Sequence, residues 1–151
     1  MYLRNGVRAI IFEERKLLAV KNRDVDGVYY ILPGGAQKPG ETLVETVQRE
    51  VREETGADAE VGPLRHVREY IGRHHEFADR HADVHGVIFF FDCRLTSPPD
   101  ASRQTEPDSA QVGVEWLELD RLASYDLWPK ALVPLLADPE ARGPVYLGDV
   151  N

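Results

Sequence analysis

Hydrophobic and polar positions alternate in short blocks at the start of the chain. Residues 7–12, Val-Arg-Ala-Ile-Ile-Phe, are rich in β-branched and aromatic side chains, and residues 16–20 resume that character after Glu13-Glu14-Arg15. A short polar break between two such runs predicts a β-hairpin. Residues 29–32 form a further short strand that Pro33-Gly34-Gly35 ends. The first part of the chain is therefore predicted to contribute mainly β-sheet.

The pattern becomes helical between Thr42 and Gly56. Thr42 can cap the first turn, and Glu45 three residues later completes a capping box. Gly56 is placed to end the helix. Apolar side chains recur every four residues and form the expected buried stripe, Leu43, Val47 and Val51.

The rest of the chain returns to strands. Residues 61–71 are predicted to form one or two strands, and residues 84–95 form a core strand apolar enough to be covered on both faces. Residues 96–111 are polar and rich in turn formers, which predicts a loop before a strand at 112–117. Asp120 is expected to cap a short helix that contains Leu122, and Pro129 to occupy the first turn of another helix at 130–136. This order predicts an α/β fold, a mixed sheet with helices on both sides.

Composition narrows the class of protein. The chain has 151 residues, of which 42% are hydrophobic and 29% charged, and its formal net charge is −8. These values are typical of a soluble globule, and the length suits one domain over residues 1–151. The acidic balance argues against nucleic-acid binding, which needs Lys and Arg on the phosphates.

The same sequence gives no sign of export or membrane insertion. No apolar run approaches the roughly 20 residues that a membrane helix needs. Residues 1–6 lack the apolar core of a signal peptide, and the one cysteine, Cys93, excludes an internal disulfide. We therefore expect a cytoplasmic protein that does not bind a membrane.

Three carboxylates lie on one face of the predicted helix. Glu50, Glu53 and Glu54 occupy positions i, i+3 and i+4, a spacing that brings side chains together. Clustered negative charges repel one another unless cations lie between them, and Mg²⁺ prefers such oxygen ligands. Most glutamate-rich helix faces are simply solvated, so the spacing alone would not indicate a metal site. Gly34 and Gly35, however, permit a sharp turn that approaches a ligand closely.

The whole segment resembles the Nudix box. Its pattern is Gly35, five residues, Glu41, seven residues, and then Arg49-Glu50-Val51-Arg52-Glu53-Glu54-Thr55-Gly56. The next position usually holds Ile, Leu or Val in that family, and here it holds Ala57, which still packs as an apolar residue. So many restricted positions make a chance match improbable. The resemblance implies the Nudix fold, an α/β/α sandwich with a mixed β-sheet.

The resemblance also implies a reaction. Nudix enzymes are pyrophosphohydrolases that cleave a diphosphate linkage in nucleoside triphosphates, or in nucleoside diphosphates joined to another group. The implied cofactor is Mg²⁺, for which Mn²⁺ can substitute, and the implied partner is a small nucleotide-like diphosphate. Bound Mg²⁺ would neutralise phosphate charge and acidify a water for attack on phosphorus.

Roles follow for the residues that match the box. Glu53 and Glu54 are the firmest implied metal ligands, with Glu50 and the backbone of Gly35 also at the ion. Gly34 and Glu41 would shape the loop beside the substrate. Arg49 would pair with the neighbouring carboxylates and fix their rotamers. Catalysis would then rest on Arg49, Glu50 and Glu53.

The general base lies at different places in different Nudix enzymes. In the box helix it would be Glu50. In a later loop it would be Glu106 or Asp108, although ordinary loop polarity also explains these two residues. Glu115, in the strand predicted at 112–117, is a third candidate.

Other functions share this fold. Some Nudix domains sense nucleotide ligands without catalysis, often with degraded boxes, whereas this box keeps its carboxylates. An isoprenoid diphosphate isomerase needs a catalytic cysteine, and the apolar neighbours of Cys93 indicate a structural thiol. The acidic charge disfavours RNA decapping. The sequence leaves open whether the chain forms a homodimer.

Two groups of side chains outside the box remain to be placed. The histidines match no zinc-finger spacing and are predicted to lie on the surface or in a substrate pocket: His66, His74, His75, His81 and His85. Several aromatic residues could stack on a base, although core packing is their more common role. They are Tyr29, Tyr30, Phe77, Trp116 and Trp128.

Overall fold

The computed structural model describes residues 1–105 and 109–151. Its strands are β1 (Tyr2–Glu13), β2 (Lys16–Asp24), β3 (Gly27–Ile31), β4 (Gly34–Ala36), β5 (Ala59–Ile71), β6 (Val84–Leu95), β7 (Gln111–Glu118), β8 (Leu127–Trp128) and β9 (Tyr146–Asp149). The α-helices are α1 (Leu43–Thr55), α2 (Ala78–His81) and α3 (Val133–Leu136). Four 3₁₀ segments join them within the described residues: η1 (Gly72–His74), η2 (Ala101–Arg103), η3 (Leu119–Ser124) and η4 (Lys130–Leu132).

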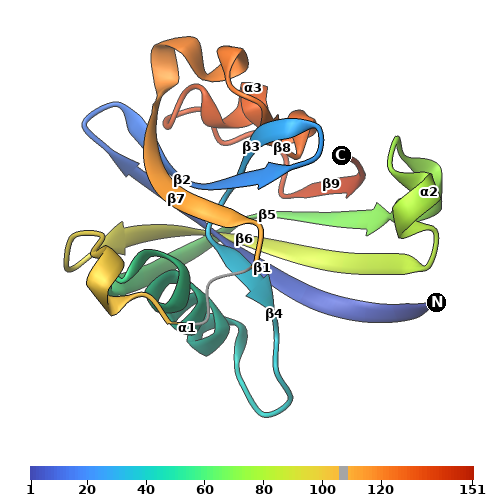
Figure 1. Ribbon diagram of the computed structural model, residues 1–151, viewed down its shortest axis with the longest axis horizontal. Coiled ribbons are helices and arrows are strands. Elements are labelled where there is room, and N and C mark those ends of the chain that lie inside the picture. Colours follow the sequence, from blue (N-terminus) through green and yellow to red (C-terminus); the bar gives the residue numbers. More distant parts are fainter. Residues whose placement is uncertain (106–108) are drawn as a thin grey trace.

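The strands form one mixed, curled sheet with β1 near its middle (Figure 1). Strand β1 pairs in parallel with β6, and β6 pairs antiparallel with β5, which carries β9 on its other edge. On the opposite side β1 turns into β2, which pairs with β3 and β7. Strand β4 pairs with the middle of β1, so the chain that follows it enters α1 beside the centre of the sheet.

Both faces of the sheet are covered. Figure 1 shows α1 on one side of the strands and α3 with its neighbouring turns on the other. Successive residues of β1 serve opposite faces: Ile11 packs in the cluster beneath α1, whereas Ile10 packs with the residues around η3 and α3. Phe91 and Phe90 of β6 divide in the same way. The prediction that this strand is covered on both faces is therefore confirmed.

Helix α1 forms as predicted. The Thr42 hydroxyl accepts the Glu45 N–H at 3.1 Å, and the Glu45 carboxylate accepts the Thr42 N–H at 2.7 Å, which completes the capping box. Val47 and Val51 are fully buried against the sheet, while Gly56 ends the helix in a left-handed conformation. These features fix the direction in which the glutamates of the box project.

Several short elements differ from the sequence prediction. Asp120 does not cap a helix, because η3 begins at Leu119 and so includes Asp120, whose carboxylate pairs with Arg15 at 2.8 Å. Pro129 precedes the next helix with extended backbone, and the predicted helix 130–136 is divided into η4 and α3. The predicted loop at 96–111 contains η2. No helix among the described residues combines the length and the apolar character needed to cross a bilayer.

Candidate functional site

The turn between β3 and α1 places two glycines against the box helix. Strand β4 puts Gly35 opposite Val7 of β1, and the Gly34 N–H donates to Glu54 Oε1 at 2.7 Å. A Cβ on Gly35 would lie 2.5 Å from Glu50 Oε1, so the carboxylate rests directly on the glycine. The two glycines thus allow the backbone and the helix carboxylates to approach one another.

Arg49 is the centre of the acidic cluster. Its guanidinium donates to both carboxylate oxygens of Glu41, with Nε at 2.5 Å and Nη2 at 2.9 Å. Nη1 donates to Glu50 at 2.7 Å and to Glu53 at 3.2 Å. Nη2 also donates to the Ala36 carbonyl at 3.1 Å, which ties the cluster to β4. One cation therefore orders three carboxylates and the loop.

These contacts change the acid–base properties of the cluster. The hydrogen bonds from Arg49 lower the pKa of Glu41 to about 2, assisted by the Lys38 N–H and the Thr46 hydroxyl and opposed by desolvation. The same hydrogen bonds, first with Glu41 and then with Glu50, raise the pKa of Arg49 above its ordinary value. Glu41 and Arg49 are therefore held as an ion pair at neutral pH.

The structure brings together most of the residues that the sequence singled out. Glu41, Arg49, Glu50 and Glu53 form one contact network, and Glu54 lies buried at its edge on the Gly34 N–H. No group of three or more His, Cys, Asp or Glu within residues 1–105 and 109–151 is arranged to hold a metal ion as it stands. The donor set still fits a hard divalent cation, because carboxylate oxygens converge beside a glycine and keep 14–18% side-chain exposure at Glu50 and Glu53.

The candidates for a general base are separated by the structure. Glu50 lies in the cluster, whereas Glu106 and Asp108 lie outside the described residues. Glu115 Oε2 accepts the Tyr30 hydroxyl at 2.6 Å. Desolvation, followed by this hydrogen bond, raises the pKa of Tyr30 to about 12, and the Glu115 carboxylate is thereby tied to Tyr30 of β3.

A hollow surface runs from the box toward the C-terminal residue. A cavity of about 320 Å³ is lined by Gly35 and by Arg4 and Arg8 of β1. A second cavity, of about 460 Å³, is lined by the aromatic residues Phe77 and Trp128. Both cavities share three lining residues, Arg68, Tyr70 and His81. Sequence reasoning singled out neither Arg68 nor Arg8, because a lone arginine in a strand has no distinguishing local pattern.

The histidines have separate environments. His66 is buried, His85 contacts Glu69, and His81 shares a 2.9 Å hydrogen bond with the Tyr70 hydroxyl. His74 and His75 both bind Asp149 of β9, at 2.7 and 2.6 Å. The prediction of surface and pocket positions therefore holds for the described histidines other than His66.

A family model described as the NUDIX domain matches residues 2–137. The chain belongs to the Nudix family. This membership confirms the resemblance carried by the box, and the mixed sheet between helices confirms the fold class. The metal-binding and catalytic roles of individual residues stay predictions.

Relatives of this Nudix chain include proteins of two sizes. Nucleoside diphosphate-linked moiety X motif 6 of Mus musculus is 38% identical over 121 residues, which cover 78% of this chain and 36% of the mouse protein. The chain thus spans about a third of that relative. The nucleoside triphosphatase NudI of Escherichia coli is 28% identical over 134 residues, covering 84% of this chain and 90% of NudI.

Solved structures share the Nudix fold of this chain. A NUDIX hydrolase from Nitrosomonas europaea superposes with a TM-score of 0.73 at 23% identity, covering 89% of this chain and 86% of the other. An ADP-ribose pyrophosphatase from Streptococcus suis gives a TM-score of 0.63 at 25% identity and covers 98% of both chains.

Proposed function

We propose that this Nudix protein is a Mg²⁺-dependent pyrophosphohydrolase that cleaves a diphosphate linkage in a nucleoside triphosphate or a nucleoside diphosphate derivative. The observation that carries the proposal is the convergence of Glu41, Glu50 and Glu53 on Arg49, beside the glycine turn. The names of NudI and of the streptococcal ADP-ribose pyrophosphatase support the reaction class.

The proposed ligands of the cation are Glu50, Glu53, Glu54 and the backbone of Gly35. A bound Mg²⁺, or Mn²⁺ in its place, would offset phosphate charge and lower the pKa of a water molecule. Arg49 contributes by holding the carboxylates in one geometry, since its donors already contact Glu50 and Glu53. Reactions of this type gain mainly from positioning and electrostatics, so such a compact cluster is sufficient.

The remaining residues of the box act on the loop. Glu41 binds the Lys38 N–H and the Thr46 hydroxyl as well as Arg49, and so joins the loop to the first turns of α1. Glu50 is our preferred general base, because it lies within this ordered cluster and against Gly35. Its role would be to take the proton of the attacking water.

The experiment is a phosphate-release screen over nucleoside triphosphates, oxidised nucleotides, ADP-ribose, nucleotide sugars and dinucleoside polyphosphates, with and without Mg²⁺. Glu53→Gln and Glu54→Gln are expected to reduce kcat on the best substrate at least about 10²-fold. In Glu54→Gln the new amide oxygen can still accept the Gly34 N–H, so thermal melting should change little. Glu60→Gln, which alters an exposed partner of Arg94, is the matched control. Full activity in both box variants would remove the proposed mechanism.

The alternative is a nucleotide-sensing module without catalysis. It predicts nucleotide binding by calorimetry together with no turnover anywhere in the panel. An isoprenoid isomerase is less well supported, because Cys93 lines neither cavity described above and its thiol donates to the Phe91 carbonyl. Burial raises the pKa of this thiol to about 12, which disfavours a reactive thiolate.

A further inference from the structure

The two cavities form one groove beside the Nudix box. Arg68, Tyr70 and His81 line both cavities, so they stand where one passes into the other. The smaller cavity reaches Gly35, which touches the Glu50 carboxylate, and the larger one is lined by the β2–β3 turn and by residues in and around α2. The groove thus leads from the acidic cluster to a site on the far side of Arg68.

Arg68 is a shielded cation whose hydrogen bonds go to neutral acceptors, while the Asp149 carboxylate acts on it only through charge–charge attraction. Its Nη1 donates to the Val150 carbonyl at 2.6 Å and to Asn151 Oδ1 at 3.1 Å, both neutral acceptors. Its Nε is screened from solvent and has no hydrogen-bond partner in the described part of the chain. Burial, with Arg8 as a second cause, lowers the pKa of Arg68 to about 10. A positive charge held in this way attracts an anion.

The neighbouring arginines add to the positive field. Arg8 lines the smaller cavity and donates from Nη1 to the Leu32 carbonyl, again a neutral acceptor. Arg4 lines the same cavity. No ion pair joins Arg4, Arg8 or Arg68 to a carboxylate within the described residues. The part of the groove that lies between Gly35 and Arg68 is therefore basic, although the whole chain has a net charge of −8.

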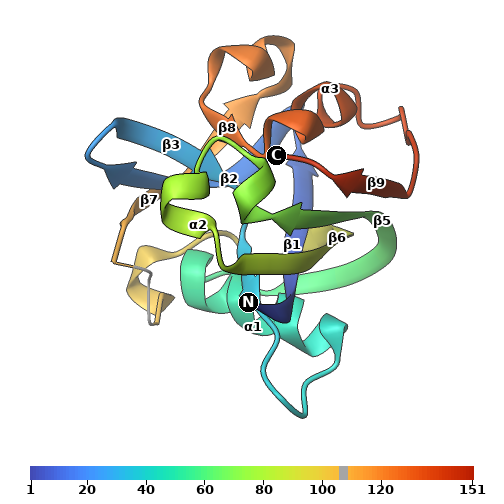
Figure 2. The ribbon, with the colours of Figure 1, turned by 90° about the vertical axis from the view of Figure 1, so that its right-hand side faces the viewer.

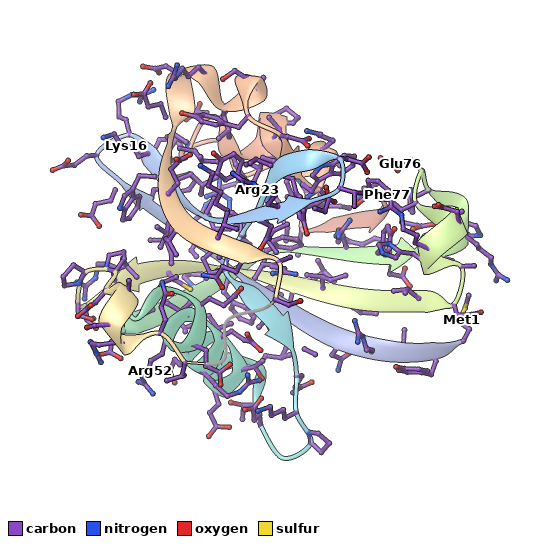
Figure 3. All side chains as sticks on the ribbon, viewed as in Figure 1. Met1, Lys16, Arg23, Arg52, Glu76 and Phe77 are labelled. Carbon is purple, nitrogen blue, oxygen red and sulfur yellow. The ribbon has the colours of Figure 1, made fainter. Side chains whose placement is uncertain are left out.

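The larger cavity is aromatic. Phe77 and Trp128 meet edge to face with ring centroids 5.1 Å apart, and Tyr29 lies on the same wall. Figure 3 shows Phe77 extending from the segment before α2 toward the β3 side of the molecule. We call Tyr29, Phe77 and Trp128 the aromatic recess. Its volume of about 460 Å³ is ample for a flat heterocycle, which stacks well on such side chains.

Three aspartates line the recess, and cations lie beside two of them, whereas the Asp24 carboxylate accepts, among the described residues, only the Asp26 N–H at 2.8 Å. Asp126 accepts Lys130 Nζ at 2.6 Å, and Asp26 lies 3.7 Å from Arg80. The guanidinium of Arg80 also lies over the Phe77 ring, 5.5 Å from its centroid. Two of the three acidic charges at the rim are therefore offset locally, and the arginines lie further in.

We propose that the groove binds a nucleotide, with its base in the aromatic recess and a phosphate group on Arg68, so that the anhydride linkage reaches Gly35. This assignment deepens the proposed function and rests on it for the identity of the reacting end. Arg68 is then a positioning residue that favours ligands with both an aromatic ring and an anionic group. Ring-free diphosphates and uncharged nucleosides each use only half of the groove.

The C-terminal residues hold Arg68 in place. Asp149 accepts hydrogen bonds from His75, the Ile71 N–H and His74, and thereby anchors β9 beside β5. Val150 and Asn151 follow directly and supply the acceptors for Arg68. Figure 2 shows the C-terminus near α2 and β8, the elements that border the recess. Val150 and Asn151 thus hold the guanidinium through neutral oxygens, and Asp149 forms no ion pair with it among the described residues.

The test measures binding in EDTA, so that it does not depend on turnover. ADP and GDP should quench tryptophan fluorescence in the wild type and in Trp116→Phe, because Trp116 packs in the core cluster under α1. Trp128→Phe should lose the quenching. Arg68→Gln is expected to weaken ADP and pyrophosphate binding about tenfold by calorimetry, while the Kd for adenosine changes less than about twofold. Phe77→Leu should weaken ADP and adenosine but not pyrophosphate.

Arg68→Lys serves as the second variant, since it keeps the charge and should recover part of the ADP affinity. Unchanged ADP affinity in folded Arg68→Gln, or quenching that survives in Trp128→Phe, would overturn the assignment. A wild type that hydrolyses nucleotides while these variants bind normally would keep the proposed function and reject the groove. Nucleotide binding with the expected variant pattern, but without hydrolysis, would support the groove and reject the proposed function.

Discussion

Replacing Gly35 with alanine would displace the Glu50 carboxylate without adding or removing a charge. The new Cβ would lie 2.5 Å from Glu50 Oε1 and 2.6 Å from its carboxyl carbon, whereas ordinary contact begins at 3.4 Å. The carboxylate would have to retreat by the difference, about 0.9 Å. It can do so because it ends a flexible side chain, but its 2.7 Å contact with Arg49 must change. A misplacement of about 1 Å costs about 10²-fold in rate.

The assay compares kcat of Gly35→Ala and wild type at saturating substrate and Mg²⁺, with thermal melting as the measure of folding. We expect kcat to fall about 10²-fold while the melting temperature changes by only a few degrees. Gly34→Ala is the contrasting variant, because its Cβ would collide with the Val7 carbonyl and approach Arg8 Cα to 2.9 Å. Backbone atoms cannot swing aside, so this variant should lose stability first. Full turnover in folded Gly35→Ala would refute the reasoning.

Three further predictions concern the charges and caps around the site. Arg49→Met should lower the free energy of unfolding by about 2 kcal/mol, which is less than the loss of a fully buried pair would cost. Added Mg²⁺ should raise the melting temperature of this variant more than that of the wild type. Equal shifts would count against a site at which Mg²⁺ and Arg49 contact the same carboxylates. Thr42→Ala should cost about 1 kcal/mol in urea unfolding with kcat unchanged at 25 °C, and a normal stability would contradict the capping role. Glu41 and Asp149 have native pKa values of about 2, below their ordinary 4.5 and 3.8, so their ionised forms stabilise the fold. The stability difference between wild type and Glu41→Gln or Asp149→Asn should be complete above about pH 5 and be lost as the pH falls through about 2 in urea titrations; a difference independent of pH would disprove it.

The residues of the box could be placed from sequence because their geometry is local. A capping box, a stripe of valines and a terminal glycine determine the start, the buried face and the end of α1. Once these are fixed, the directions of Glu50, Glu53 and Glu54 follow from helical spacing. The hairpin of β1 and β2 was equally local, since Glu14 and Arg15 alone make its turn. The order of strands and helices along the chain, together with the resemblance to the Nudix family, then predicted the remaining layers.

Other features depend on contacts between distant parts of the chain. Strand β9 follows a polar segment and exists because Asp149 binds residues about 75 positions earlier, a pairing that no local pattern encodes. The predicted cap at Asp120 was wrong because η3 begins one residue earlier, at Leu119, and the Asp120 carboxylate pairs instead with Arg15, 105 residues away. Only the three-dimensional structure separates the aromatic residues that pack in the core from those that line a cavity: Tyr30 is buried, whereas Phe77 and Trp128 line the larger cavity. The guanidinium of Arg68 is held by neutral acceptors on Val150 and Asn151, more than 80 positions later in the chain.

The guanidinium of Arg49 has a consequence for the life of the protein in the cell. Because it already offsets the repulsion among Glu41, Glu50 and Glu53, the helix that bears them can fold before any divalent ion arrives. If the cluster binds Mg²⁺ as proposed above, a shortage of the ion would stop catalysis while the protein stayed folded, and activity would return when the ion was restored. The rate of the proposed reaction would then follow the supply of the ion, while the amount of folded protein stayed constant.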